Sequence, residues 1–409
     1  MGRTKIEWTD ETWNPLRARN KRTGGVGHYC QKVGPDCANC YAEVLQTRFR
    51  NSIQFRPADL PLVEPFLDHR VLLAPFAWAR PRKIFPCDMT DLFGHWVPDE
   101  QLDLIFAVMA LTPRHTYQVL TKRTKRMAEY FLTPDRHNRI ELAAEQIARG
   151  PATFAGKHVV PRTLPNVWLG ASCGNQATAD ARLPHLVRTP AAIRFVSAEP
   201  LIGPLNLTPW LPHFVCTCGW SSVVDPDPKH QWEPGTIQCP ACRGFDTDFV
   251  FGGLDLVISG GESGKRKHPA PRPSHPAWAR SLRDQCVPAG VCFFWKQWGE
   301  WVPVGSGYEL EGDSVFRSDG VITGRIARVR YAEHLEVKRG RQSVAMQAGP
   351  DEFGNTIKET PIGVTTESSV EHDERLGSYT AIRRVGKKRA GRLLDGREWN
   401  ELPETLAHV

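Results

Sequence analysis

Short apolar runs alternate with helix-length segments from Lys83 onward, and no other feature of the sequence constrains the fold as much. The expected strands lie within residues 82–91, 117–123, 166–172, 193–200, 254–262 and 291–297. Residues 98–111 carry apolar side chains at helical spacing, and a second helix is expected over residues 177–187. Strands that alternate with helices, and that end in polar or glycine-rich residues, are typical of a parallel α/β sheet.

The polar strand ends indicate how this sheet closes. Polar residues at the carboxyl ends of parallel strands suit a partial (β/α) barrel with its site at that rim, and a doubly wound open sheet is the alternative. With 409 residues the chain can form one large domain with appendages, or two domains. We expect a barrel-like core from residues 1–205 and 246–302, an insertion at 206–245 and a basic C-terminal extension at 303–409. Within the extension, the polar residues 349–374 are interpreted as a mobile connector.

Three cysteines near the start of the chain, Cys30, Cys37 and Cys40, lie within eleven residues of one another. Thiolates this close repel each other and oxidise readily unless a metal centre lies among them. Three thiolates leave a tetrahedral ion or a cubane iron–sulfur cluster one ligand short, and an open coordination position permits chemistry. We therefore expect an open cluster here. A zinc site closed by His28 is the alternative.

Further motifs are spread in order over most of the chain. They lie at residues 4–10 (Thr-Lys-Ile-Glu-Trp-Thr-Asp), 12–15, 30–41, 89–93, 120–123, 197–201, 260–264, 296–299 and 385–399. In these segments the chain resembles the phage Gp37/Gp68 family, a radical-SAM-like group. The resemblance implies a partial barrel of radical SAM type, with a 4Fe-4S cluster that binds S-adenosylmethionine and yields a 5′-deoxyadenosyl radical. Radical SAM enzymes generally separate their cysteines by three and then two residues, whereas six and two separate them here.

Polar residues at the expected strand ends are candidates for the rest of the site. Glu199 and Asp91 are candidate catalytic carboxylates, since a carboxylate at a strand end is better placed in a rim pocket than unpaired in the core. Lys122 suits a phosphate or a carboxylate, and a solvated basic face is its alternative. The candidate cofactor-binding residues, which follow partly from the resemblance, are Gly260, Gly261, Glu262, Ser263 and Tyr41.

The candidate cofactor contacts differ in their expected roles. Glu262 could accept from the ammonium group of S-adenosylmethionine, as a Gly-Gly-Glu segment does on the second strand of radical SAM enzymes. The glycines before it would let the backbone approach the ligand closely. An exposed glutamate in a strand-to-helix turn is the alternative. Tyr41 is expected to shield the cluster from solvent. Trp295, Trp298 and Trp301 could stack a flat ring or could instead close the barrel wall.

A second group of cysteines lies in the expected insertion. Cys216 and Cys218 form one pair, and Cys239 and Cys242 form another. Two such pairs in short turns resemble a zinc ribbon, and four thiolates close a tetrahedral structural site. The alternative is four buried, reduced cysteines. We expect structural zinc, because a polar insertion of this kind needs a metal to hold it together.

Composition limits the class of protein. No apolar run approaches the roughly twenty residues that span a bilayer, and the start of the chain has no apolar signal core. We therefore expect a cytoplasmic protein that does not engage a membrane. Seven of the eleven cysteines lie in the two clusters, which favours metal ligation over disulfides. The net charge of +7 permits a polyanionic partner. Basic residues gather near the end of the chain at Arg383, Arg384, Lys387, Lys388, Arg389, Arg392 and Arg397.

These observations leave three hypotheses for function. The first is a radical-SAM-like enzyme that modifies or repairs a nucleic-acid component or nucleotide and receives electrons from a donor protein. The second is a non-enzymatic, metal-stapled nucleic-acid-binding protein. The third is a hydrolase that uses Asp91, Glu199 and Glu262 around a divalent metal ion.

Overall fold

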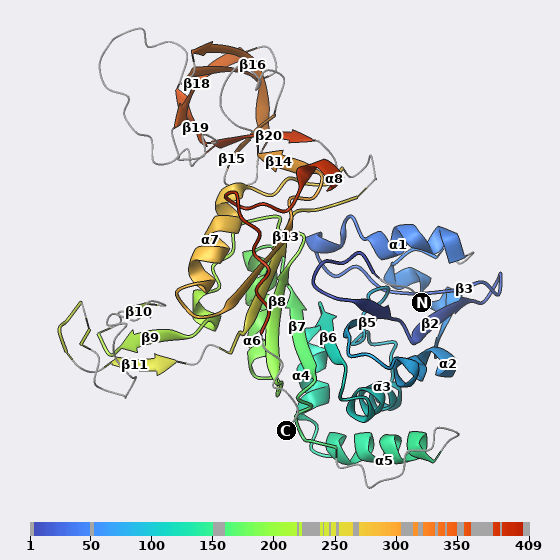
Figure 1. The fold of residues 1–409 in the computed structure, drawn as a ribbon. Helices are drawn as coiled ribbons and strands as arrows, with labels where there is room; N and C mark the ends of the chain where they lie inside the picture. The colour runs from blue at the N-terminus through green and yellow to red at the C-terminus, as the bar shows by residue number, and fades with distance from the viewer. Residues whose placement is uncertain are drawn as a thin grey trace.

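Seven parallel strands of the protein form a curled sheet, a half-barrel, in a computed structural model (Figure 1). The structure describes residues 4–49, 53–149, 160–218, 221–222, 238–239, 241–244, 247–250, 253–264, 270–303, 314–317, 322–331, 334–339, 342–349, 356–360, 379–384 and 387–403. The strand order is β1-β5-β6-β7-β8-β12-β13. The strands are β1 (Glu11–Trp13), β5 (Lys83–Pro86), β6 (Thr116–Thr121), β7 (Val167–Ser172), β8 (Ile193–Ala198), β12 (Leu256–Gly260) and β13 (Cys292–Gln297). The expected α/β fold with a curled parallel sheet is therefore confirmed.

Helices connect these strands and cover the outer face of the sheet (Figure 1). They are α3 (Asp99–Leu111), α4 (Thr124–Leu132), α5 (Arg136–Ala148), α6 (Gln176–Val187) and α7 (Pro276–Cys286). In α3, Leu102, Ile105 and Phe106 are fully buried, as their helical spacing predicts. The start of α6 is fixed by a capping box in which the Asn175 side chain accepts a hydrogen bond from the Thr178 amide at 3.1 Å.

The interior of the half-barrel is filled by large apolar side chains. The residues of this cluster are Trp8, Phe85, Trp168, Phe195, Leu256, Ile258 and Phe294. Trp8 reaches them from the N-terminal segment, and its ring centre lies 4.9 Å from that of Phe85. A Cβ atom at Gly170 would lie 2.4 Å from the Phe195 ring, so only glycine leaves room for that ring. Because these side chains fill the interior, the open space of the half-barrel lies at the carboxyl ends of its strands.

The insertion between β8 and β12 folds as a separate small sheet. Its strands are β9 (His213–Cys216), β10 (Ser221–Ser222) and β11 (Thr247–Val250), in the order β10-β9-β11. Both neighbours pair with β9 in antiparallel fashion. Since β11 belongs to this sheet, the insertion extends beyond the boundary expected at residue 245.

A second seven-stranded sheet, which is antiparallel, follows the half-barrel in the chain. Its strands are β14 (Trp301–Pro303), β15 (Ser314–Arg317), β16 (Ile322–Tyr331), β17 (His334–Arg339), β18 (Gln342–Gly349), β19 (Thr356–Thr360) and β20 (Tyr379–Arg384). Because β19 pairs with both β18 and β20, six of the strands form a closed ring. The expected connector is therefore wrong for residue 349, in β18, and for residues 356–360, in β19, and its residues 350–355 and 361–374 lie outside the described residues.

The last described residues, 387–403, return to the half-barrel and are called the closing segment here. The segment begins with α8 (Lys387–Ala390) and packs along β13. Asn400 forms an antiparallel bridge to Phe294, and the Trp295 amide donates to the Trp399 carbonyl at 2.9 Å. Leu394 is fully buried in the core. The closing segment therefore covers the edge strand that a half-barrel would otherwise expose.

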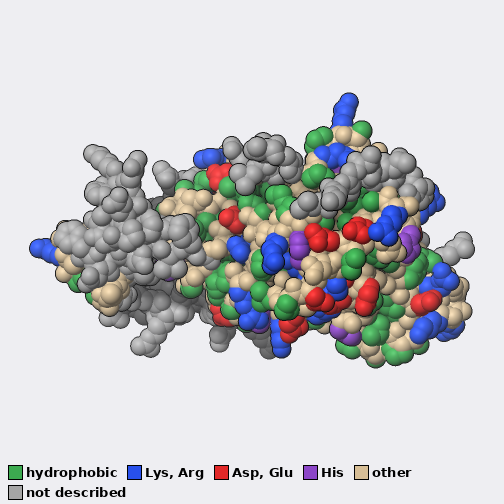
Figure 2. Space-filling view, turned by 90° about the horizontal axis from the view of Figure 1, so that it is seen from below, with side chains coloured by type: hydrophobic (Ala, Val, Ile, Leu, Met, Phe, Trp, Pro, Cys, Tyr) green, Lys and Arg blue, Asp and Glu red, His purple; other side chains and the backbone are tan. Residues whose placement is uncertain are grey.

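The face seen from below in Figure 1, on the side of α5, carries acidic and basic side chains mixed together (Figure 2). Arg139 in α5 shows the pattern, with ion pairs to Asp103 at 3.0 Å and to Asp135 at 2.8 Å. Asp103 is buried and Asp135 is exposed, and mixed charges of this kind leave no strong field of one sign on the surface. No helix among the described residues has the length and apolar character needed to cross a bilayer.

Candidate functional site

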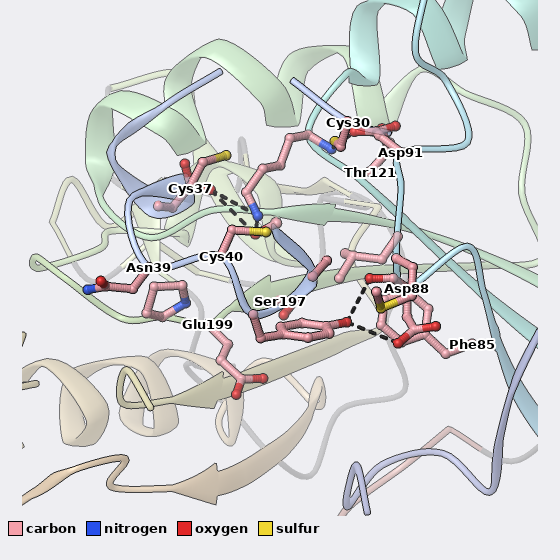
Figure 3. Close-up of a pocket in the computed structure, with 18 of the residues that line it drawn as sticks. Cys30, Cys37, Asn39, Cys40, Phe85, Asp88, Asp91, Thr121, Ser197 and Glu199 are labelled. Carbon is pink, nitrogen blue, oxygen red and sulfur yellow. Dashed lines mark hydrogen bonds and ion pairs between the residues drawn. The ribbon is translucent and has the colours of Figure 1, made fainter. Parts of the chain in front are cut away.

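A cavity of about 430 Å³ lies at the carboxyl ends of the half-barrel strands. It is the place where most of the predicted site residues meet (Figure 3). The predicted residues that line it are Cys30, Cys37, Cys40, Tyr41, Asp91, Lys122, Glu199, Gly261, Glu262 and Ser263. Gly260 and the four cysteines of the insertion are not among the lining residues. Since the lining residues come from segments far apart in the sequence, the parallel sheet brings them together, as the strand-end pattern predicts.

The three N-terminal thiols all line this cavity, on the loop between β3 (Val26–Gly27) and α1 (Tyr41–Leu45) (Figure 3). This loop lies within the connection between β1 and β5, the first two strands of the half-barrel. Burial, with a smaller effect of the nearby Asp91 carboxylate, raises the pKa of Cys30 to about 12. Burial also raises the pKa of Cys40. Thiols of this kind stay protonated at neutral pH unless a positive centre binds among them.

A buried ion network holds the thiol loop on the half-barrel. Asp36, between Cys30 and Cys37, accepts a hydrogen bond from Arg182 of α6 at 2.8 Å. The ammonium group of Lys122 lies 3.4 Å from Asp36 and donates to the Ser172 hydroxyl at 3.0 Å. Burial alone would raise the pKa of Asp36, but Lys122 and Arg182 outweigh it and lower that pKa. Lys122 therefore anchors the loop, which is a role beyond the catalytic one expected for it.

The zinc site with His28 as its fourth ligand is wrong. The His28 side chain is buried outside the cavity lining, and its Nδ1 atom lies 3.1 Å from the Leu16 carbonyl oxygen. Among the described residues, the four cysteines of the insertion are the only group of three or more His, Cys, Asp or Glu residues whose candidate ligand atoms all lie within 4.8 Å of one another. The N-terminal thiols are therefore not spaced for one shared ion. A cluster of several irons binds each thiolate at a different iron and separates the sulfurs more widely.

Asp91 uses both of its carboxylate oxygens in contacts within the protein. Oδ1 accepts from the Thr121 hydroxyl at 2.7 Å, and Oδ2 accepts from the Arg123 guanidinium at 2.9 Å. Arg123 also donates to the Gln31 carbonyl beside Cys30 at 2.9 Å. Asp91 therefore joins the loop after β5 to the end of β6 and, through Arg123, to the thiol loop.

Glu199 lines the cavity and belongs to a row of alternating charges. Its Oε1 atom accepts from the Lys296 ammonium group at 2.6 Å. Lys296 lies 3.8 Å from Glu7, and Glu7 in turn lies 3.7 Å from Lys387. Glu7 and Lys387 come from opposite ends of the chain, and the sequence analysis assigned neither of them to the site. Their only sequence signal is that both fall in segments that carry the family resemblance.

Glu262 connects the end of β12 to the thiol loop. Its carboxylate accepts from the Arg272 guanidinium at 2.5 and 3.0 Å, from the Arg272 amide at 2.7 Å and from the Asn39 side chain at 2.8 Å. Glu262 is buried, so the exposed-glutamate alternative is wrong. The glycine before it serves packing, because a Cβ atom at Gly261 would lie 2.0 Å from the Trp298 carbonyl oxygen. The close approach is therefore to the loop after β13.

The three carboxylates of the hydrolase hypothesis line one cavity but do not form a common metal-binding group. Asp91, Glu199 and Glu262 bind Arg123, Lys296 and Arg272, respectively, each with its own cation. The described residues hold no group of three carboxylates whose oxygens lie within 4.8 Å of one another. A shared divalent metal ion needs such a group.

Asp88 differs from every other carboxylate that lines the cavity. It follows Cys87, which turns the chain at the end of β5 with a positive φ of 59°. Its Oδ1 atom accepts from the Asn14 side chain at 2.5 Å, and its Oδ2 atom lies 3.2 Å from the Tyr41 hydroxyl. Burial raises its pKa. Asp88 forms no ion pair with any described residue, whereas Asp36, Asp91, Glu199 and Glu262 each have a cation within 4 Å.

Trp295 in β13, with Trp298 and Trp301 after it, does not form a stacking surface for a ligand. Trp295 is fully buried, and its ring centre lies 4.8 Å from that of Trp298 in an edge-to-face arrangement. The Trp301 indole donates to the Pro271 carbonyl at 2.8 Å. None of the three lines the cavity. The ring-stacking expectation is therefore wrong, and the side chains close the wall of the half-barrel.

The four cysteines of the insertion form a second candidate site. The sulfurs of Cys216 and Cys242 lie 3.6 Å apart, and those of Cys218 and Cys239 lie 3.7 Å apart. A tetrahedral ion with metal–sulfur bonds of about 2.3 Å separates its ligand sulfurs by roughly 3.8 Å. The group could therefore hold one metal ion.

Comparison with known proteins identifies the family. No curated protein and no solved structure matches the chain. A family model described as "Protein of unknown function (DUF5131)" matches residues 3–403. This match spans the half-barrel, the insertion, the second sheet and the closing segment. The chain therefore belongs to the DUF5131 family.

Proposed function

We propose that the protein is a radical-SAM-type iron–sulfur enzyme that acts on a nucleic-acid component. The observation that carries the proposal is the position of the three thiols. Cys30, Cys37 and Cys40 line one cavity at the carboxyl end of a parallel half-barrel, within the connection between its first and second strands. A cavity of about 430 Å³ at this rim is large enough for a small-molecule ligand.

The residues that line the cavity fit a cluster and a cationic cofactor. The three thiols would hold a 4Fe-4S cluster, and Asp88 would accept from the ammonium group of S-adenosylmethionine. Such a cluster, when bound, supplies the electron that cleaves S-adenosylmethionine to a 5′-deoxyadenosyl radical. Asp88 follows β5, the second strand of the half-barrel, where radical SAM enzymes generally carry their Gly-Gly-Glu segment. Glu262 follows β12, the sixth strand, and is already bound to Arg272 and Asn39.

A nucleic-acid substrate is supported by charge and by the resemblance to the phage Gp37/Gp68 family. The net charge is +7, and basic residues gather at residues 383–397. Radical chemistry suits the inert C–H bonds and cross-linked bases that repair or modification must attack. A donor protein would supply the electron.

The test uses the full-length protein purified without oxygen. We expect a brown protein with broad visible absorbance and bound iron. Alanine at Cys30, Cys37 or Cys40 should abolish both, whereas Cys216→Ala should leave them unchanged. The reduced protein should convert S-adenosylmethionine to 5′-deoxyadenosine. An iron-free wild-type protein, or wild-type iron content in the Cys30 variant, would contradict the proposal.

The insertion favours a second candidate function. We infer that its four thiols hold a structural zinc ion, which would make the insertion a zinc-ribbon-like module. A colourless protein that contains only zinc and binds nucleic acid would support a metal-stapled binding protein without enzymatic activity.

A further inference from the structure

We propose that Lys387 anchors a phosphate group of the substrate at the mouth of the cavity. The proposal rests on the proposed function, in which the substrate is a nucleic-acid component. It adds a specific contact and places that contact on the closing segment, far in sequence from the thiol loop.

The closing segment holds Lys387 in a defined place. The Trp298 indole donates to the Leu393 carbonyl at 2.8 Å, and the Arg392 guanidinium donates to the Lys296 carbonyl at 3.1 Å. Farther along, Asp395 accepts from Arg280 at 2.8 Å. These contacts fix the segment on β13 and α7. Lys387, at the start of α8, lines the cavity as a result.

Lys387 is the least firmly paired cation in the cavity lining. Its one ion pair with a described residue is to Glu7 at 3.7 Å, beyond hydrogen-bond distance. Lys296 and Arg123, by contrast, contact their carboxylates at 2.6 and 2.9 Å. The Lys387 side chain is 42 % exposed, and Lys388 beside it is also exposed. A loosely paired, partly exposed ammonium group at a cavity mouth favours an incoming anion.

The rest of the lining indicates which anion fits. Trp8, Phe85 and Ile6 give the cavity an apolar part that suits a flat ring. A ligand that joins a flat ring to a phosphate, as a nucleotide unit does, matches both features. The lysine ammonium binds phosphate as a point charge with three donors. Both a free nucleotide and a strand carry this chemistry, so the experiment must distinguish them.

The experiment measures binding of a fluorescein-labelled oligothymidylate to the full-length protein by anisotropy over a range of salt concentrations. Lys387→Ala should weaken binding about tenfold, as expected for loss of one charged hydrogen bond. The slope of log K against log salt should fall in magnitude by about 0.7, the value for one phosphate contact on a single strand. Lys387→Arg should retain both the wild-type affinity and the wild-type salt dependence. The matched control is Arg149→Ala, an exposed cation just after α5 whose ion pair is with Glu145, and it should behave as wild type.

A second variant keeps the proposal testable if Lys387→Ala folds poorly. Glu7→Gln removes the carboxylate that competes for Lys387 and should tighten binding of the oligothymidylate. Unchanged affinity in both the Lys387→Ala and Glu7→Gln variants, or no binding by the wild-type protein, would overturn the proposal.

Competition distinguishes the two sources of phosphate. Thymidine monophosphate that displaces the probe, where thymidine does not, supports a free nucleotide. Displacement only by unlabelled oligothymidylate supports a strand. Cleavage of S-adenosylmethionine is measured separately on the wild-type protein without any nucleic acid. Its failure would refute the proposed enzymatic function and leave the phosphate contact to be judged by the binding data.

Discussion

The Asp88 carboxylate forms no ion pair with any described residue, and its ionised form lowers the stability of the folded protein. Because burial raises its pKa above the ordinary value of 3.8, the ionised carboxylate destabilises the folded state at neutral pH. Asparagine at this position would keep an acceptor for Asn14, and the main-chain carbonyl would still accept from Tyr41 at 2.7 Å.

We therefore predict that Asp88→Asn makes the cofactor-free protein more stable at pH 7. As the pH falls through the raised pKa toward 3.8, the wild-type carboxylate takes up a proton in the folded state first, so the difference should shrink. Thermal unfolding at several pH values measures this. A difference that stays constant with pH would contradict the explanation.

Glu262 gives a contrasting prediction, because its charge is fully paired. Glu262→Gln removes the ion pair to Arg272 and weakens the contact with Asn39. We expect a loss of about 2 kcal/mol in the free energy of unfolding, since Arg272 is left partly buried without its partner. Denaturant unfolding tests this, with Glu398→Gln on the exposed part of the closing segment as the control. Unchanged stability would show that the network is not needed for folding.

The sequence located many site residues but not their partners. Asp91, Lys122 and Glu199 follow strands, and the carboxyl ends of parallel strands meet at one edge, so their convergence is predictable. Their ion pairs are not predictable from the sequence, because the partner of each residue comes from another segment. Asp88 was part of an expected strand and loop, yet only the structure shows that no described cation neutralises it. Lys387 reaches the cavity, and pairs with Glu7, through tertiary contacts that no local pattern encodes.

At the scale of elements, strands with continuous apolar runs were predicted well. The six expected strands correspond to β5, β6, β7, β8, β12 and β13 within a few residues. The first strand, β1, was missed because three residues carry too little pattern. The closing segment was expected to be part of an extension, because its packing depends on isolated side chains such as Leu394.

This dependence gives a prediction for the closing segment. Leu394→Ala should lower the free energy of unfolding by about 3 kcal/mol, because it leaves a cavity at a fully buried position. The neighbouring Leu393 is exposed, so Leu393→Ala should have little effect. Denaturant unfolding of both variants tests this. Equal stabilities would mean that the segment does not pack on β13 in solution.

For the whole molecule, the two cysteine groups should behave independently. Cys216→Ser should remove zinc from the insertion and leave the iron content unchanged, because the four insertion thiols form their own ligand group. Metal analysis of the anaerobically purified protein tests this, and Cys292→Ser, outside both groups, is the control. A joint loss of iron and zinc would show that the two sites depend on each other.

The contact between Glu7 and Lys387 also bears on how a cell makes this protein. The thiol loop emerges early from the ribosome. The wall of the cavity is complete only after residues 387–403 have also emerged. Glu7 is translated near the start and Lys387 near the end, so the two residues cannot make contact until most of the chain has been synthesised. Any chaperone or cluster-delivery factor that acts during translation would thus bind a half-barrel whose cavity still lacks the closing segment.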